Sequence, residues 1–106
     1  MLNRKALADA LHDLHKSDLK AGAADKTLKY AVGQILDAIA ATGTAPGEDD
    51  SRHLDEAITA LSQGHHFLAR SSILLILEGT AHQQSGKQAP YLSVDELRHK
   101  LNAVAV

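Results

Sequence analysis

The most regular pattern of apolar and polar positions in this chain lies between Asp25 and Gly43. At about 100° per residue, the apolar positions fall on one face, as in an amphipathic helix; they are Leu28, Val32, Ile35, Leu36 and Ile39. Asp25 is suited to cap the start of this helix, and Thr42-Gly43 is suited to end it. The pattern predicts a helix from Asp25 to about residue 41.

The same spacing predicts three further helices on either side of this one. They cover residues 2–19, closed by Gly22, residues 51–63, and about residues 65–84. The glycine between the last two, Gly64, marks either a bend in one long helix or a turn between two.

The last predicted helix has the clearest local start signal. Ser93 and Glu96 form an S-x-x-E capping box, and Leu92 and Leu97 occupy the positions of a hydrophobic staple. We therefore expect a helix that starts after Ser93 and continues through Leu101.

The segment 67–77 differs from the others because it is apolar on every side. Its apolar side chains lie on three sides of the helix: Phe67 and Leu74 on one, Leu68 and Leu75 on a second, and Ile73, Ile76 and Leu77 at the back. A helix that is apolar all round is enclosed by neighbours. The sequence thus predicts an all-α, compact four- to five-helix bundle in one domain over residues 1–106, with the helix at about 65–84 at its centre and helix 25–41 packed on it across Gly33.

The same segment suggests a partner. Leaving Ile73, Ile76 and Leu77 exposed would forfeit about 1.5–3 kcal/mol each relative to burial. Either the chain's own helices or a second subunit must cover them. We expect a second subunit, which makes these three the predicted contact residues of a homodimer or of a complex with another protein.

Composition narrows the function further. Aromatic residues make up only 3% of the chain, the net charge is −2, and there is no cysteine. There is no basic excess to attract nucleic acid, and thiol nucleophiles, disulfides and thiolate metal ligands are excluded. Arg4 and Lys5 are not followed by the apolar run of a signal peptide, and 67–77 is shorter than the roughly 20 residues that span a bilayer. We expect a cytoplasmic protein without a membrane segment.

Seven histidines raise the possibility of a metal site. The candidate ligands are His12 and His15 in an H-x-x-H pattern, Glu78 and His82 four positions apart, and His99 in a Glu-x-x-His pattern. A metal needs three or four ligands to converge, whereas helical spacing places most of these at the surface. We expect no metal, cofactor or catalytic residue. The alternative is a metal-binding helical bundle with His and Glu ligands and an enzymatic role, which requires Glu78, His82 and one of the other histidines to meet.

The sequence thus favours a non-catalytic protein–protein interaction module that self-associates through the apolar helix around 67–77. No P-loop, dinucleotide-binding fingerprint or Gly-x-Ser-x-Gly motif is present to indicate an enzyme class.

Overall fold

The computed structural model describes residues 3–41, 43, 48–79 and 92–104. These residues form six helices and no strand, so the predicted all-α fold is confirmed. The radius of gyration is 12.9 Å, close to the roughly 13 Å expected of a globular chain of 100 residues. No helix in the described part of the chain is long and apolar enough to cross a bilayer.

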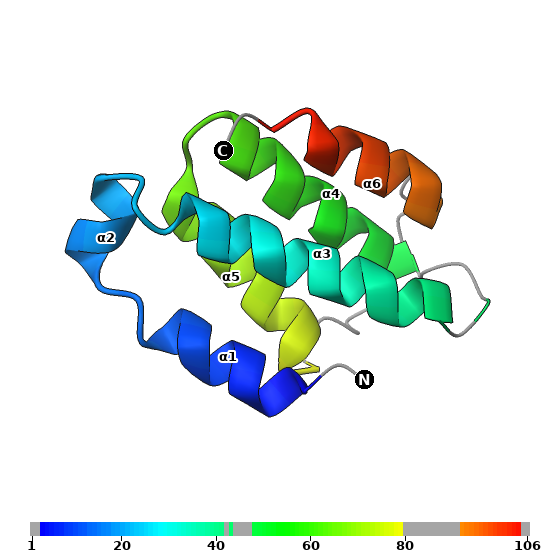
Figure 1. Ribbon diagram of the computed structural model, residues 1–106, viewed down its shortest axis with the longest axis horizontal. Coiled ribbons are helices and arrows are strands. Elements are labelled where there is room, and N and C mark those ends of the chain that lie inside the picture. The colour runs from blue at the N-terminus through cyan, green and yellow to red at the C-terminus, as the bar shows by residue number, and fades with distance from the viewer. Residues whose placement is uncertain (1–2, 42, 44–47, 80–91, 105–106) are drawn as a thin grey trace.

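The helices pack so that one of them contacts four others (Figure 1). Their bounds are α1 Arg4–His12, α2 Lys16–Lys20, α3 Asp25–Ala41, α4 Glu48–Ser62, α5 His66–Leu77 and α6 Val94–Asn102. Helix α5 contacts α1, α2, α3 and α4, and its most extensive contact is with α4, while α6 packs on α3 and α4. The apolar segment is therefore the central helix, as predicted.

The predicted single helix over 2–19 is wrong, because the chain breaks into α1 and α2. His15 has extended backbone angles and begins α2, and its N–H donates to the Asp18 carboxylate at 3.3 Å. The carbonyl of Leu14, freed at the break, accepts from the Arg70 guanidinium on α5 at 3.0 Å. The break lets Leu11 and Leu19 both reach the core, where each is fully buried.

Gly64 separates two helices rather than bending one. Its φ of +78° is a left-handed conformation that favours glycine. The N–H of Gly64 donates to Leu61, and the N–H of His65 donates to Ala60 at 2.8 Å. These two bonds form a Schellman motif, which satisfies carbonyls at the end of α4 and turns the chain back so that α5 packs along α4.

Two helix ends differ from their predicted positions. Helix α4 begins at Glu48, before the predicted start at residue 51. Helix α5 ends at Leu77, followed by Glu78 and by Gly79 with a φ of +70°. Residues 80–84 of the predicted helix lie outside the described residues.

The start of α6 is confirmed in detail. Ser93 Oγ accepts from the Glu96 N–H at 3.2 Å, and Glu96 Oε1 accepts from the Ser93 N–H at 3.3 Å. Leu92 and Leu97 both contribute to the core. The buried hydroxyl of Ser51 accepts from the Leu92 N–H and donates to the Leu92 carbonyl, so α4 holds the segment that enters α6.

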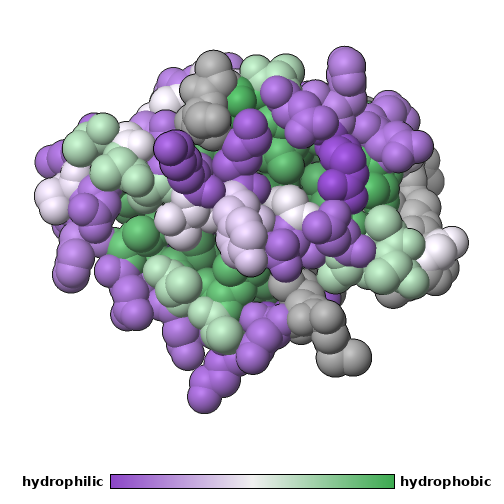
Figure 2. All heavy atoms as spheres, in the orientation of Figure 1, coloured by the Kyte–Doolittle hydropathy of each residue, from purple (hydrophilic) through white to green (hydrophobic). Residues whose placement is uncertain are grey.

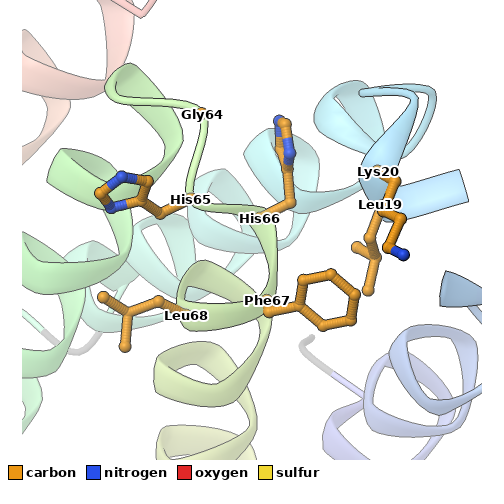
Figure 3. A pocket seen from close by; sticks show the side chains of 7 residues that line it. All are labelled: Leu19, Lys20, Gly64, His65, His66, Phe67 and Leu68. Atoms are coloured by element: carbon orange, nitrogen blue, oxygen red, sulfur yellow. The ribbon is translucent and has the colours of Figure 1, made fainter.

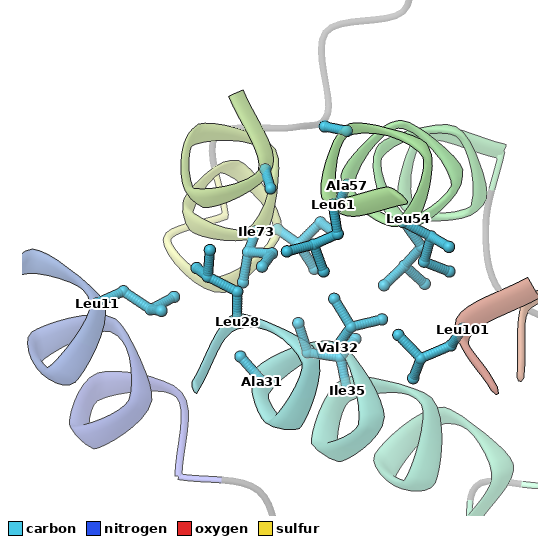
Figure 4. Close-up of a cluster of buried hydrophobic side chains, with 14 of the residues drawn as sticks. Leu11, Leu28, Ala31, Val32, Ile35, Leu54, Ala57, Leu61, Ile73 and Leu101 are labelled. Carbon is cyan, nitrogen blue, oxygen red and sulfur yellow. The ribbon is translucent and has the colours of Figure 1, made fainter. Parts of the chain in front are cut away.

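One continuous core fills the space between the helices (Figure 4). Its largest fully buried side chains are Leu11, Leu19, Leu28, Leu36, Leu54, Ile58, Ile73 and Leu97, with Val32. The sequence predicts that Gly33 faces the central helix, but in the structure Gly33 faces Leu101 of α6. A Cβ at Gly33 would lie 3.9 Å from Leu101 Cδ2. On the face shown in Figure 2, hydrophilic atoms cover most of the helices, and hydrophobic atoms show between them.

The chain's own helices do not enclose the central helix on every side, and whether a second subunit covers the rest stays a prediction. Ile73 is fully buried, but Phe67, Leu68 and Leu75 are 40%, 52% and 37% exposed. Four helices contact α5, and they leave one side of it open.

This difference between the two sides of α5 predicts unequal costs of truncation. Ile73→Ala should lower the free energy of unfolding by about 2–5 kcal/mol, because it empties a packed core site. Leu75→Ala, the matched control two residues away, should cost far less, because its side chain keeps substantial contact with water. Urea denaturation of both variants checks this, and equal losses would contradict the assigned burial.

Candidate interaction surface on helix α5

The open side of α5 is a strip of mainly apolar side chains. We call it the α5 face and define it as Phe67, Leu68, Ser71 and Leu75, which are all exposed. At about 100° per residue these positions cover one side of the helix. The opposite side carries buried side chains, namely Ala69, Ser72, Ile73, Ile76 and Leu77. Exposed apolar strips of this kind are a recognised mark of interaction sites.

A cleft of about 440 Å³ adjoins the α5 face where α5 begins (Figure 3). Its lining residues come from the end of α2, the α4–α5 turn and the first turn of α5, and they are Leu19, Lys20, Gly64, His65, His66, Phe67 and Leu68. The Phe67 ring points toward Leu19 and Lys20, whereas His65 and Leu68 point to the other side of the first turn. The cleft thus combines an apolar lining with the cationic Lys20 and two histidines.

An acidic residue of α3 holds this end of α5. Nε2 of His66 lies 2.5 Å from Oδ1 of Asp25, and both side chains are largely buried. Asp25 Oδ1 has no aligned hydrogen-bond donor, so the contact is an ion pair when His66 is protonated. Gly22, with a φ of +74°, turns the chain beside them; a Cβ there would lie 3.7 Å from the Asp25 carboxylate. The start of the α5 face is therefore fixed against α3.

Helix α1 holds the other end of α5. Arg4 donates from Nη1 to the Ile76 carbonyl at 3.1 Å, which satisfies one of the last carbonyls of α5. His12 Nε2 lies 3.3 Å from Glu78 Oε2, with side chains that are 53% and 47% exposed. The sequence pairs Glu78 with His82 by spacing. His82 lies outside the described residues, and no helical periodicity could reveal a contact between positions 12 and 78.

The candidate metal ligands do not form a cluster in the described part of the chain. His12 meets Glu78, but His15 is exposed at the start of α2, and His99 is exposed on α6, which has no extensive contact with α1, α2 or α5. Within the described ranges, no group of three or more His, Cys, Asp or Glu residues is placed to hold a metal ion. A zinc site needs at least three protein ligands, and the pair of His12 and Glu78 supplies two.

The three predicted contact residues need a correction. Ile73, Ile76 and Leu77 are 0%, 3% and 6% exposed within the single chain, so the chain's own helices cover them. The side chains left at the surface are Phe67, Leu68 and Leu75, which the sequence analysis did not select. Periodicity gives no clear signal for them: Ser71 and Glu78 lie on the exposed side, but the polar Ser72 and Arg70 lie next to the buried side chains.

Comparisons of the chain with models of known protein families, with curated proteins and with solved structures find no match. The chemistry of the site is therefore the basis for its function. Its lining offers apolar area and the positive charge of Lys20, and the lining residues that the structure describes include no hydroxyl or thiol side chain that the His66–Asp25 pair could activate. Such a lining is suited to bind an apolar group.

The contact between His12 and Glu78 should contribute little to stability. A double-mutant cycle with His12→Ala and Glu78→Ala should give a coupling energy below about 1 kcal/mol, because both side chains are half exposed and water screens their charges. Urea denaturation of the four proteins near pH 6 measures it. A coupling of several kcal/mol would show that the pair is a structural lock between α1 and α5.

Proposed function

We propose that this protein is a non-catalytic interaction module that self-associates through the α5 face. The supporting observation is that the central helix of the bundle keeps Phe67, Leu68 and Leu75 at the surface while its opposite side forms the core. Removing apolar surface from water stabilises an assembly by roughly 25 cal/mol per Å². Because α5 is anchored at both ends, by His66 and Arg4, its face is held in place before a partner arrives, which lowers the entropic cost of binding.

The size of the surface predicts a weak association. Stable dimers bury about 800 Å² on each partner, and three partly exposed side chains on one helix supply only a fraction of this area. We therefore expect monomers and dimers to exchange, with the dimer favoured at high protein concentration. A cytoplasmic location stays a prediction from the sequence.

The α5 face can be tested with a polar substitution that leaves the core intact. Leu68→Gln should shift the monomer–dimer equilibrium toward monomer, because it removes half-exposed apolar area and keeps a residue that favours helices. Sedimentation velocity over a concentration series measures the shift. The matched control is Tyr30→Gln, since Tyr30 is a 61% exposed apolar side chain on another helix, α3.

We expect the control to associate like the unmodified protein and the Leu68 variant to associate at least several-fold more weakly. An unmodified protein that stays monomeric at millimolar concentration would reject self-association. Equal weakening by both substitutions would place the contact elsewhere.

A further inference from the structure

We infer that the occupant of the α5 face is the α5 helix of a second copy, which runs antiparallel with a two-fold axis passing between Ser71 and Ser72. This inference rests on the proposed function and specifies its partner and geometry. Two features of α5 carry it: the placement of its exposed leucines, and the opposite chemistry of its two ends.

The exposed leucines are placed symmetrically. Leu68 and Leu75 are seven positions apart, which is two helical turns or about 10 Å, and they lie almost in line along the helix. Their midpoint falls between Ser71 and Ser72. An antiparallel second copy centred there sets Leu68 of each chain against Leu75 of the other, as an isologous interface requires. The exposed residue near the axis, Ser71, is small, and small residues let helices approach closely.

The ends of α5 are also symmetric about this midpoint, and their charges are opposite. The start has the exposed side chains of His65 and Lys20 beside the cleft, together with the positive end of the helix dipole. The C-terminal end of α5 has Glu78, which is 47% exposed although it contacts His12, together with the negative end of the helix dipole. His65 and Glu78 are equally distant in sequence from the midpoint, so antiparallel pairing brings Glu78 of one copy toward the cationic start of the other.

The cleft also complements the segment of the second copy that reaches it. Phe67 lies on the Lys20 side of the cleft and Leu68 on the His65 side, and the segment that the antiparallel copy brings to it presents an apolar side chain, Leu75, followed by a carboxylate. A parallel arrangement would instead place the two copies of Lys20 near one another and the two copies of Glu78 near one another. Like charges would then repel, which costs energy. A small apolar carboxylate could fill the cleft alone, but it would leave Leu75, two turns away, in water. A second helix covers both.

Cysteine cross-linking tests the direction of pairing, because the chain has no cysteine of its own. Ser71→Cys lies near the axis and should form a disulfide-linked dimer on mild oxidation, whichever way the helices run. An equal mixture of Leu68→Cys and Leu75→Cys chains distinguishes the directions. Antiparallel pairing predicts mainly mixed disulfides between positions 68 and 75, identified by peptide mass mapping, and parallel pairing predicts mainly 68–68 and 75–75 disulfides. Ser17→Cys, an exposed position on α2, measures random collision.

The possible outcomes distinguish the claim of antiparallel pairing from the claim of self-association through the α5 face. A mixed 68–75 product in several-fold excess supports the antiparallel pair. Efficient Ser71→Cys cross-linking with mainly 68–68 and 75–75 products overturns the antiparallel geometry and leaves self-association standing. Ser71→Cys cross-linking no faster than that of Ser17→Cys rejects both. Octanoate, an apolar carboxylate used as probe, would also overturn the inference if it bound the cleft with Ser71→Cys showing no cross-link.

A charge exchange tests the contact between the ends. Glu78→Lys should weaken dimerisation roughly fivefold, since each dimer loses two half-exposed attractions and gains repulsion. Combining it with Lys20→Glu should restore most of the loss, because the charges are exchanged and the pairs are re-formed. His12→Ala, which removes only the contact within the chain, should leave dimerisation unchanged. A double variant as weak as the single one would overturn the role of the helix ends.

Discussion

The packing of α5 against α4 is the constraint on which the rest of the structure depends. The Schellman turn at Gly64 folds the two helices back on one another, and the side chains of α5 that face inward, such as Ile73 and Ala69, are fully buried. Helices α1, α2 and α3 then cover further sides of α5. The four helices that contact α5 leave one strip of it at the surface, with Phe67, Leu68 and Leu75 exposed.

Polar contacts determine which strip remains. At its start, α5 is held to α3 by His66 and Asp25, and at its end it is held to α1 by the bond from Arg4 to the Ile76 carbonyl. Between them, Arg70 bonds the Leu14 carbonyl at the break between α1 and α2. These contacts join different helices and therefore fix the rotation of α5 in the bundle, which leaves Leu68 and Leu75 outward. The proposed interaction surface is thus a consequence of how the core is assembled.

Much of the fold could be predicted from the sequence, because its signals are local. The amphipathic period of α3 and the capping box at Ser93 depend on residues within a few positions of one another, and both are confirmed. The break between α1 and α2 could not be predicted, because it depends on Arg70, 56 positions from Leu14. Periodicity also could not show which side of α5 faces inward, since every side is apolar. The sequence therefore selected Ile73, Ile76 and Leu77, which lie on the buried side of α5.

The central claim is that α5 has one side in the core and one side available to a second copy. Amide NMR spectra of the unmodified protein, recorded on dilution from millimolar concentration, test it most directly, because they locate the residues whose surroundings change on dissociation. The account predicts concentration-dependent shifts along α5 and the cleft, largest near Leu68 and Leu75, with the resonances of Tyr30 and α6 unmoved. Spectra that do not change with concentration, or shifts confined to other helices, would contradict it.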